Sequence, residues 1–156
     1  MTTSEISLNN LEVIRKNALK LVEGLSDEQL LTIPDGFNNN LLWQLGHLVS
    51  TGQGLSYRLS GLPQGIPSHY GPMFGKDSSP LNWDSVEDIN IAEIKSLLLS
   101  TLEQTRTDIK AGVFQEYTPY QTSFGVKLNS FEESLIFRNL HEGLHLGSMM
   151  ALKKLV

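Results

Sequence analysis

The amino-acid sequence predicts an all-α protein, a four-helix bundle with a long loop between its second and third helices. Two observations predict this fold class. Four segments carry apolar residues at helical spacing, and the sequence shows neither convincing strand alternation nor an internal repeat of roughly 20 to 50 residues. The length of 156 residues suits a single domain over residues 1–156 with its own core. Four amphipathic helices of about 18 to 25 residues are typical of a bundle.

The first two helices are marked by an apolar stripe and by capping residues. The first is predicted over residues 7–24, with Gly24 as its stop. Its stripe consists of Leu8, Leu11, Ile14, Ala18, Leu21 and Val22. The second helix follows the asparagines at 38–40, which are good N-cap residues, and reaches about Leu59.

Two capping boxes indicate where the last two helices begin. The third helix is predicted to follow Asn90, with Glu93 as the reciprocal partner, and to end at Gly112. The fourth begins at Ser130, with Glu133 in the same role, and runs nearly to the end of the sequence.

The connection over residues 60–89 separates the second and third helices. It holds four of the six prolines in the chain and four glycines. A connection of this length can run along the whole bundle, so we expect the second and third helices to be parallel. Long loops in compact domains tend to be functional, and the sequence leaves open whether this one is a lid or packs against the bundle.

Composition excludes several classes of protein. The net charge of −5 and the pI of about 5.3 argue against a nucleic-acid surface, which needs basic side chains to offset phosphate charge. The absence of cysteine excludes disulfides and thiolate ligands. No signal-peptide core and no apolar run of about 18 residues is present. We therefore expect a cytoplasmic protein without a nucleic-acid or membrane partner.

Residues 141–145 read HEGLH and match the zinc-protease pattern H-E-x-x-H. His141 and His145 lie about 40° apart around a helix axis, so both can bind one divalent ion. The 11 residues after His145 contain no His, Asp or Glu that could complete a protease site. No strand is expected that would bind a peptide substrate edge-on. These surroundings disfavour a zinc peptidase.

His47 is the best candidate for a third ligand, because catalytic metal sites usually have three protein ligands and an open position. It lies in the second helix beside Gly46, Gly52 and Gly54. Each helical glycine costs about 1 kcal/mol relative to alanine, so this helix is expected to gain close packing or space in return. The predicted metal ligands are His47, His141 and His145, whereas His69 fits a solvated loop residue.

Rotation of the fourth helix places Phe137, Leu140, Leu144 and Ala151 on its apolar, core-facing arc. Arg138, Glu142 and Met149 then lie beyond the histidines, toward polar surface. Glu142 is a candidate catalytic base, with a solvated helix carboxylate as the alternative. Arg58, Arg138 and Tyr120 are candidate substrate-binding residues, and Tyr70 and Tyr117 are further candidates for the pocket wall.

The chain resembles the DinB/YfiT-like superfamily of small four-helix-bundle metalloenzymes. NNLLWQLGHLV in the second helix, the long loop after it and HEGLHLGSM in the fourth helix carry this resemblance. It implies that His47, His141 and His145 bind a divalent metal ion, with zinc or nickel preferred. It also implies thiol S-transferase or hydrolase chemistry on a small molecule, with a low-molecular-weight thiol as a candidate cofactor. Homodimers are common in this superfamily.

Two hypotheses about function follow. In the first, the protein is a metal-dependent hydrolase or thiol S-transferase in which the bound ion activates water or a thiol. In the second, it is a non-catalytic dimeric binding protein whose histidines are structural or vestigial. The apolar residues around much of the fourth helix favour a homodimer under either hypothesis.

Overall fold

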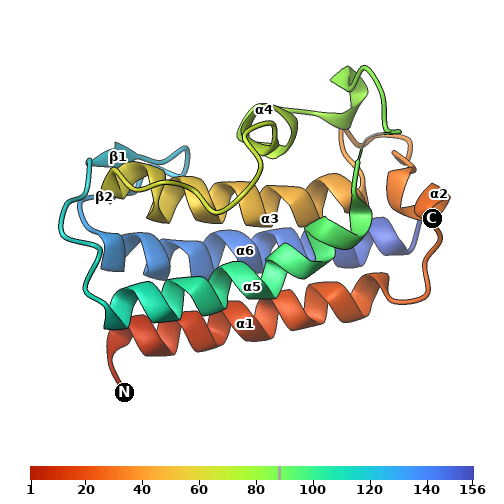
Figure 1. The fold of residues 1–156 in the computed structure, drawn as a ribbon. Helices are drawn as coiled ribbons and strands as arrows, with labels where there is room; N and C mark the ends of the chain where they lie inside the picture. The colour runs from red at the N-terminus through yellow and green to blue at the C-terminus, as the bar shows by residue number, and fades with distance from the viewer. Residues whose placement is uncertain (88) are drawn as a thin grey trace.

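The computed structural model describes residues 1–87 and 89–156 of the protein. Over these residues, four long helices pack together (Figure 1). They are α1 (Thr3–Val22), α3 (Leu41–Ser56), α5 (Ile91–Lys110) and α6 (Phe131–Lys153). The prediction of an all-α bundle is confirmed.

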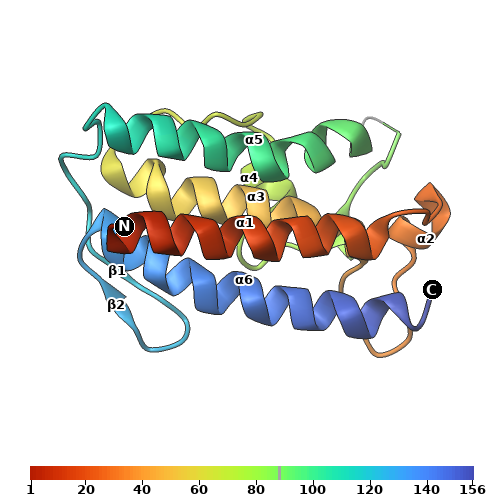
Figure 2. The same ribbon diagram turned by 90° about the horizontal axis from the view of Figure 1, so that it is seen from below.

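Each long helix packs against two others. Helix α1 lies against α5 and α6, and α3 lies against the same two helices from the other side (Figures 1 and 2). Helices α3 and α5 run in the same direction, because the connection after α3 returns along the bundle before α5 begins (Figure 1). This confirms the predicted parallel arrangement.

Side-chain caps begin three of the long helices as predicted. Asn40, Asn90 and Ser130 each accept a hydrogen bond from the backbone N–H three residues later. The second hydrogen bond of each predicted capping box, from the backbone N–H of Asn90 to Glu93 and from that of Ser130 to Glu133, is not formed, so this part of the prediction is wrong. Glu93 instead accepts from the Tyr70 hydroxyl, and Glu133 accepts from the backbone N–H of Asn129.

Complete capping boxes occur at two other helix starts. Thr2 and Glu5 cap α1, which therefore begins four residues before the predicted start at residue 7. Ser26 and Gln29 cap the short helix α2 (Asp27–Leu31), which the sequence analysis missed. In both cases Ser or Thr is followed three residues later by Glu or Gln, which is the sequence signature of a capping box.

The remaining short elements were also missed. Two 3-10 helices, η1 (Arg58–Ser60) and η2 (Pro80–Asn82), flank α4 (Tyr70–Phe74) within the long connection. The expectation of no strand is corrected by a small antiparallel hairpin, in which β1 (Tyr120–Gln121) pairs with β2 (Lys127–Leu128). Elements of two to five residues are too short to show a hydrophobic period.

The glycines of α3 allow other groups to approach this helix closely. A methyl group at Gly46 would overlap the ring of Phe74, so the glycine lets α4 dock on α3. A methyl group at Gly52 would lie 2.8 Å from guanidinium nitrogens of both Arg15 and Arg138. The predicted gain in close packing is confirmed at these two positions, and the long connection packs against the bundle through α4.

The orientation of α6 differs from the prediction. Leu140 and Leu144 are 52% and 53% exposed, so the expectation that they face the core is wrong. Arg138 and Glu142, which were expected to lie toward polar surface, are buried. We call the exposed side the outward face of α6. It consists of Ile136, Leu140, Gly143, Leu144, Gly147, Ser148, Met150 and Ala151.

The outward face carries no charged side chain between Glu133 and Lys153. It does not indicate a membrane span, however. Among the helices in the part of the chain that the structure describes, none is both long enough and apolar enough to cross a bilayer.

Candidate metal centre

Three histidines meet between α3 and α6. His47 comes from the middle of α3, and His141 and His145 come from successive turns of α6. Nε2 of His141 lies 3.4 Å from Nε2 of His47 and 3.2 Å from Nε2 of His145. One ring nitrogen of each residue lies within 4.8 Å of the others, so the cluster can hold a metal ion.

Hydrogen bonds fix the orientation of two of the rings. Nδ1 of His47 lies 2.6 Å from the backbone carbonyl oxygen of Phe74. Nδ1 of His145 lies 2.6 Å from Oε1 of Gln44, whose amide group in turn donates to Asn39. A carbonyl oxygen only accepts, so both Nδ1 atoms carry the proton. Nε2 of each ring therefore presents a lone pair to the centre of the cluster.

The spacing of the Nε2 atoms fits a metal ion. The Nε2 lone pairs of His47 and His145 both face Nε2 of His141. A neutral His141 can donate one N–H to only one of them, so the other lone pair is left without a donor. Four ligands arranged tetrahedrally about Zn²⁺ at 2.0–2.1 Å lie roughly 3.3 Å apart. The observed separations of 3.2 and 3.4 Å match this value. Nδ1 of His141 is buried and has no hydrogen-bond partner in the described residues.

Burial keeps the three imidazoles neutral. Desolvation, together with the neighbouring His47, lowers the pKa of His141 from 6.5 to about 4 and that of His145 to about 3. Burial also lowers the pKa of His47, against the opposing effect of the Phe74 carbonyl. Neutral imidazole is the form that binds a metal ion, so these side chains would need no deprotonation near pH 7 to hold one.

Trp43 of α3 and the long connection together hold the ring of His47. The indole of Trp43 stacks on that ring with a centroid separation of 4.4 Å and an interplanar angle of 16°. Trp43 in turn donates through Nε1 to the hydroxyl of Ser78 at 2.9 Å. The connection orients the ring of His47 directly, through the carbonyl of Phe74 at the end of α4, and indirectly, through the bond from Trp43 to Ser78. It therefore has a structural role at the site.

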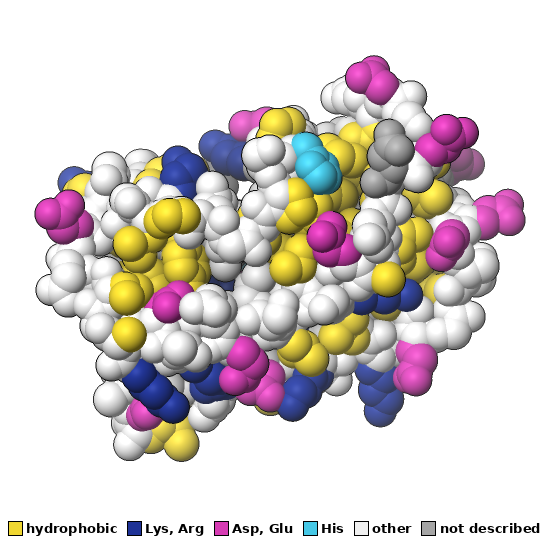
Figure 3. All heavy atoms as spheres, viewed as in Figure 1, with side chains coloured by type: hydrophobic (Ala, Val, Ile, Leu, Met, Phe, Trp, Pro, Cys, Tyr) yellow, Lys and Arg dark blue, Asp and Glu magenta, His cyan; other side chains and the backbone are white. Residues whose placement is uncertain are grey.

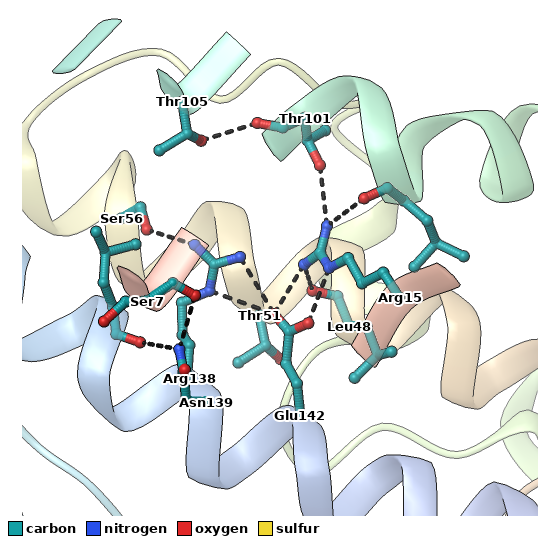
Figure 4. A network of polar contacts seen from close by, with 12 residues as sticks. Ser7, Arg15, Leu48, Thr51, Ser56, Thr101, Thr105, Arg138, Asn139 and Glu142 are labelled. Carbon is teal, nitrogen blue, oxygen red and sulfur yellow. Dashed lines mark hydrogen bonds and ion pairs between the residues drawn. The ribbon is translucent and has the colours of Figure 1, made fainter. Parts of the chain in front are cut away.

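Glu142 lies in a buried ion-pair network behind the histidines (Figure 4). Its carboxylate accepts from Arg15 at 2.8 and 2.9 Å and from Arg138 at 3.1 and 3.3 Å. Burial alone would raise the pKa of Glu142, but the two guanidinium groups hold it below its ordinary value. The other partners of the two arginines are the carbonyls of Leu48 and Leu98 and the hydroxyls of Thr101 and Ser56.

This network connects all four long helices at the level of the histidines. Arg15 belongs to α1, Leu48 and Ser56 to α3, Leu98 and Thr101 to α5, and Arg138 and Glu142 to α6. Leu48 directly follows His47, and Glu142 directly follows His141. The network therefore holds the backbone at the histidine-bearing turns of α3 and α6 in one relative position.

The histidines open onto a pocket of about 240 Å³, which we call the histidine pocket. Phe124 from the hairpin and Phe137 from α6 form apolar parts of its wall. Lys76 and Asp77 lie at its exposed edge. Asp77 adopts a left-handed backbone conformation, with φ at 66°, which is uncommon outside glycine. The rest of the wall comes from Thr51, Leu55, Tyr120, Thr122 and Ser123.

The predicted site residues fall into two groups. His47, His141, His145 and Tyr120 line the histidine pocket, and Arg58 lies in an adjoining one. Glu142 and Arg138 face the buried network instead. The alternative of a solvated Glu142 is wrong, because the residue is 1% exposed. The catalytic role of Glu142 and the substrate-binding role of Arg138 stay predictions, and this placement favours a structural role for both.

The other candidates lie away from the cluster. His69 lines a separate pocket beside Met73 and Trp83. Tyr70 is buried against Phe74 and donates to Glu93, and Tyr117 packs against apolar neighbours. Neither tyrosine lines the histidine pocket as the described residues form it.

Sequence analysis missed several residues that shape the site. Arg15 lies on the stripe of α1 between Leu11 and Ala18, and an arginine at a core position was a usable signal of a buried partner. Gln44 lies three residues before His47, on a face of α3 that the structure buries. The carbonyl of Phe74 gives no sequence signal, because any residue at that position would supply it.

Comparison with known proteins finds one family. A model of the DinB superfamily matches residues 10–149, a span that includes all three histidines. A search for similar curated proteins finds no match.

Proposed function

Since the chain belongs to the DinB superfamily, we propose that it is a metalloenzyme that acts on a small molecule by hydrolysis or by thiol S-transfer. His47, His141 and His145 would hold the divalent ion, with zinc or nickel preferred because imidazole nitrogen suits both. The observation that carries the proposal is the convergence of three Nε2 atoms at 3.2 and 3.4 Å, with two of the rings fixed through Nδ1. A low-molecular-weight thiol is the co-substrate for the transfer reaction.

The residues around the pocket have different roles in the proposed reaction. A divalent ion bound here lowers the pKa of a water or thiol that it contacts. Phe124 and Phe137 place apolar ring surface beside His141. Asp77 is the one carboxylate on the described wall of this pocket. We assign it the role of accepting the proton that water or thiol releases, since both oxygens of Glu142 are held by guanidinium groups.

This placement also bears on the zinc-peptidase hypothesis. In zinc peptidases the glutamate of H-E-x-x-H is the base for the metal-bound water. Here the carboxylate of Glu142 accepts four hydrogen bonds within the buried network. The HEGLH segment therefore supplies two ligands and a structural ion pair, and we do not propose peptidase activity.

A turnover assay tests the proposal. Protein reconstituted with Zn²⁺ or with Ni²⁺ is assayed for hydrolysis of 4-nitrophenyl acetate and for transfer of a small thiol to 1-chloro-2,4-dinitrobenzene. We expect one of these activities to require the metal, and to be lost in both His141→Ala and Asp77→Asn. If activity is the same with and without metal, the catalytic proposal is wrong. If Asp77→Asn retains full activity, the assignment of Asp77 is wrong.

The outward face of α6 favours a second proposal, that the protein forms a homodimer. Three large apolar residues, Ile136, Leu140 and Leu144, follow one another at intervals of four and are all about half exposed. Gly143 and Gly147 beside them have open space around the position of a Cβ atom, so another backbone can approach closely. Exposed apolar surface of this kind marks interaction sites.

Charge at the two ends of α6 favours a second copy of this chain as the partner. Glu132 is exposed before the outward face begins, and Lys154 is exposed after it ends. An antiparallel pairing centred on Gly143 sets Glu132 of each copy opposite Lys154 of the other, as a two-fold interface requires. If metal is absent from the purified protein, this dimer is the basis of the alternative function, a non-catalytic binding protein.

A further inference from the structure

A second pocket adjoins the histidine pocket. Its volume is about 280 Å³, and it shares Thr51, Leu55, Lys76 and Tyr120 with the histidine pocket. The two pockets are therefore neighbouring compartments of one cavity system. Each alone is smaller than roughly 300 Å³, the lower limit of ordinary small-molecule sites, so a substrate of ordinary size extends across both.

The second pocket is positively charged. Arg58 from η1 and Lys76 from the turn after α4 are its charged lining residues in the described part of the chain. Neither forms an ion pair within the described residues, whereas Arg15, Arg106 and Arg138 all do. In the space-filling view, Lys and Arg side chains appear on the upper side of the molecule between the hairpin and α4 (Figure 3).

The wall of the second pocket leaves room beside these cations. The guanidinium of Arg58 lies over Gly54, where an added Cβ would be 3.7 Å from Nη2. Gly71 and Gly75 line the same wall without side chains, and Thr51 lines both pockets. Two cations with free donors, beside a wall of small residues, form a site that matches the charge and hydrogen-bonding of an oxyanion.

We infer that the substrate carries an oxyanion, a carboxylate or a phosphate, which Arg58 and Lys76 bind in the second pocket while its reacting end lies at the histidines. This inference rests on the proposed function. Lys76 lines both pockets, so it lies where the anionic end and the reacting end of one molecule join. Arg58 and Lys76 are specificity-determining residues, and neutral analogues are bound less tightly.

The oxyanion site is tested first without metal. Inorganic phosphate and succinate are titrated separately into metal-free, ¹⁵N-labelled protein, and the amide resonances of Gly54 and Gly75 are followed. We expect saturable shifts that weaken with added salt, and the tighter of the two ligands identifies the class of oxyanion. The double variant Arg58→Ala/Lys76→Ala is expected to bind at least about tenfold more weakly. The control Lys127→Ala removes an exposed lysine on β2 and is expected to bind like wild type.

The results that overturn the inference are specific. Both substituted side chains are exposed, so the double variant is expected to fold, which the dispersion of its spectrum verifies. If phosphate and succinate cause no saturable shift in wild type, the second pocket is not an oxyanion site. If the double variant binds them as wild type does, these two residues do not form it.

A second titration tests whether one ligand can occupy the oxyanion site and reach the histidines at the same time. Protein loaded with Co²⁺ is titrated with 6-mercaptohexanoate and 6-mercaptohexanol, which have chains of the same length, and the thiolate-to-cobalt absorption band reports binding. We expect the carboxylate to bind at least about tenfold more tightly in wild type and equally in the double variant. Equal binding of both thiols to wild type would overturn the link between the pockets. Failure to bind Co²⁺ would instead overturn the proposed function and leave the phosphate result standing.

Discussion

Replacement of Glu142 by glutamine removes the one negative charge between Arg15 and Arg138 while keeping the shape of the side chain. Breaking a buried ion pair by removing one partner costs about 3–5 kcal/mol. Glutamine keeps one acceptor oxygen, and the arginines keep their carbonyl and hydroxyl partners. We therefore expect a loss near the lower limit, about 3 kcal/mol. With a denaturant dependence of about 2 kcal/mol/M, the urea midpoint falls by about 1.5 M.

The matched control is Glu12→Gln. Glu12 also pairs with two cations, Lys16 and Arg106, but it is 29% exposed. Pairs of this kind contribute about 0.2–1 kcal/mol each, so the loss of both should lower the midpoint by about 0.2–1 M. Urea unfolding followed by far-ultraviolet circular dichroism measures both variants.

Two results would refute this account of Glu142. Equal shifts of the urea midpoint in Glu142→Gln and Glu12→Gln would show that the buried network contributes no more to stability than the exposed pairs of Glu12. Unchanged stability combined with lost activity would favour the catalytic role instead. Replacing the whole network, as Arg15→Met/Glu142→Leu/Arg138→Met, leaves no unpaired charge and should restore much of the stability that Glu142→Gln loses.

Two further predictions concern α3 and α6. Gly52→Ala should lower the free energy of unfolding by about 1–3 kcal/mol, because its methyl group displaces both guanidiniums. Gly54→Ala should raise the free energy of unfolding by about 0.5–1 kcal/mol, because its methyl group meets no close atom. If urea unfolding shows Gly52→Ala to be the more stable variant, the packing described here is contradicted. Leu140→Glu should convert a dimer to a monomer in sedimentation velocity, whereas Leu81→Glu, at a 63% exposed position in η2, should not; a dimer that survives Leu140→Glu would exclude the outward face as its interface.

The long helices could be predicted because local signals specify them. Asn40, Asn90 and Ser130 cap their helices in the sequence and in the structure alike. The spacing of His141 and His145 fixes their common direction whatever surrounds α6. That these two histidines face one centre could therefore be predicted before the fold was known.

The rotation of α6 could not be predicted from its own period. Apolar residues occur around much of this helix, and the side that faces the core includes Arg138 and Glu142. Arg15 on α1 supplies two of the four hydrogen bonds that the buried Glu142 carboxylate accepts. This pairing spans 127 positions in the sequence, so no local window contains it. The contact between the Phe74 carbonyl and His47 could not be predicted either, because every residue has a backbone carbonyl and the sequence does not show which one lies at the site.

The most direct test of the central claim is elemental analysis of protein purified without a histidine tag. Wild type and His69→Ala should each carry about one divalent ion per chain, and His47→Ala should carry none. This result would establish a site that joins α3 to α6 through three imidazoles. If His47→Ala retains its metal, α6 binds the ion without α3, and the three-histidine centre is wrong. If wild type carries no metal and gains no stability from added Zn²⁺ or Ni²⁺, the metalloenzyme proposal itself is contradicted.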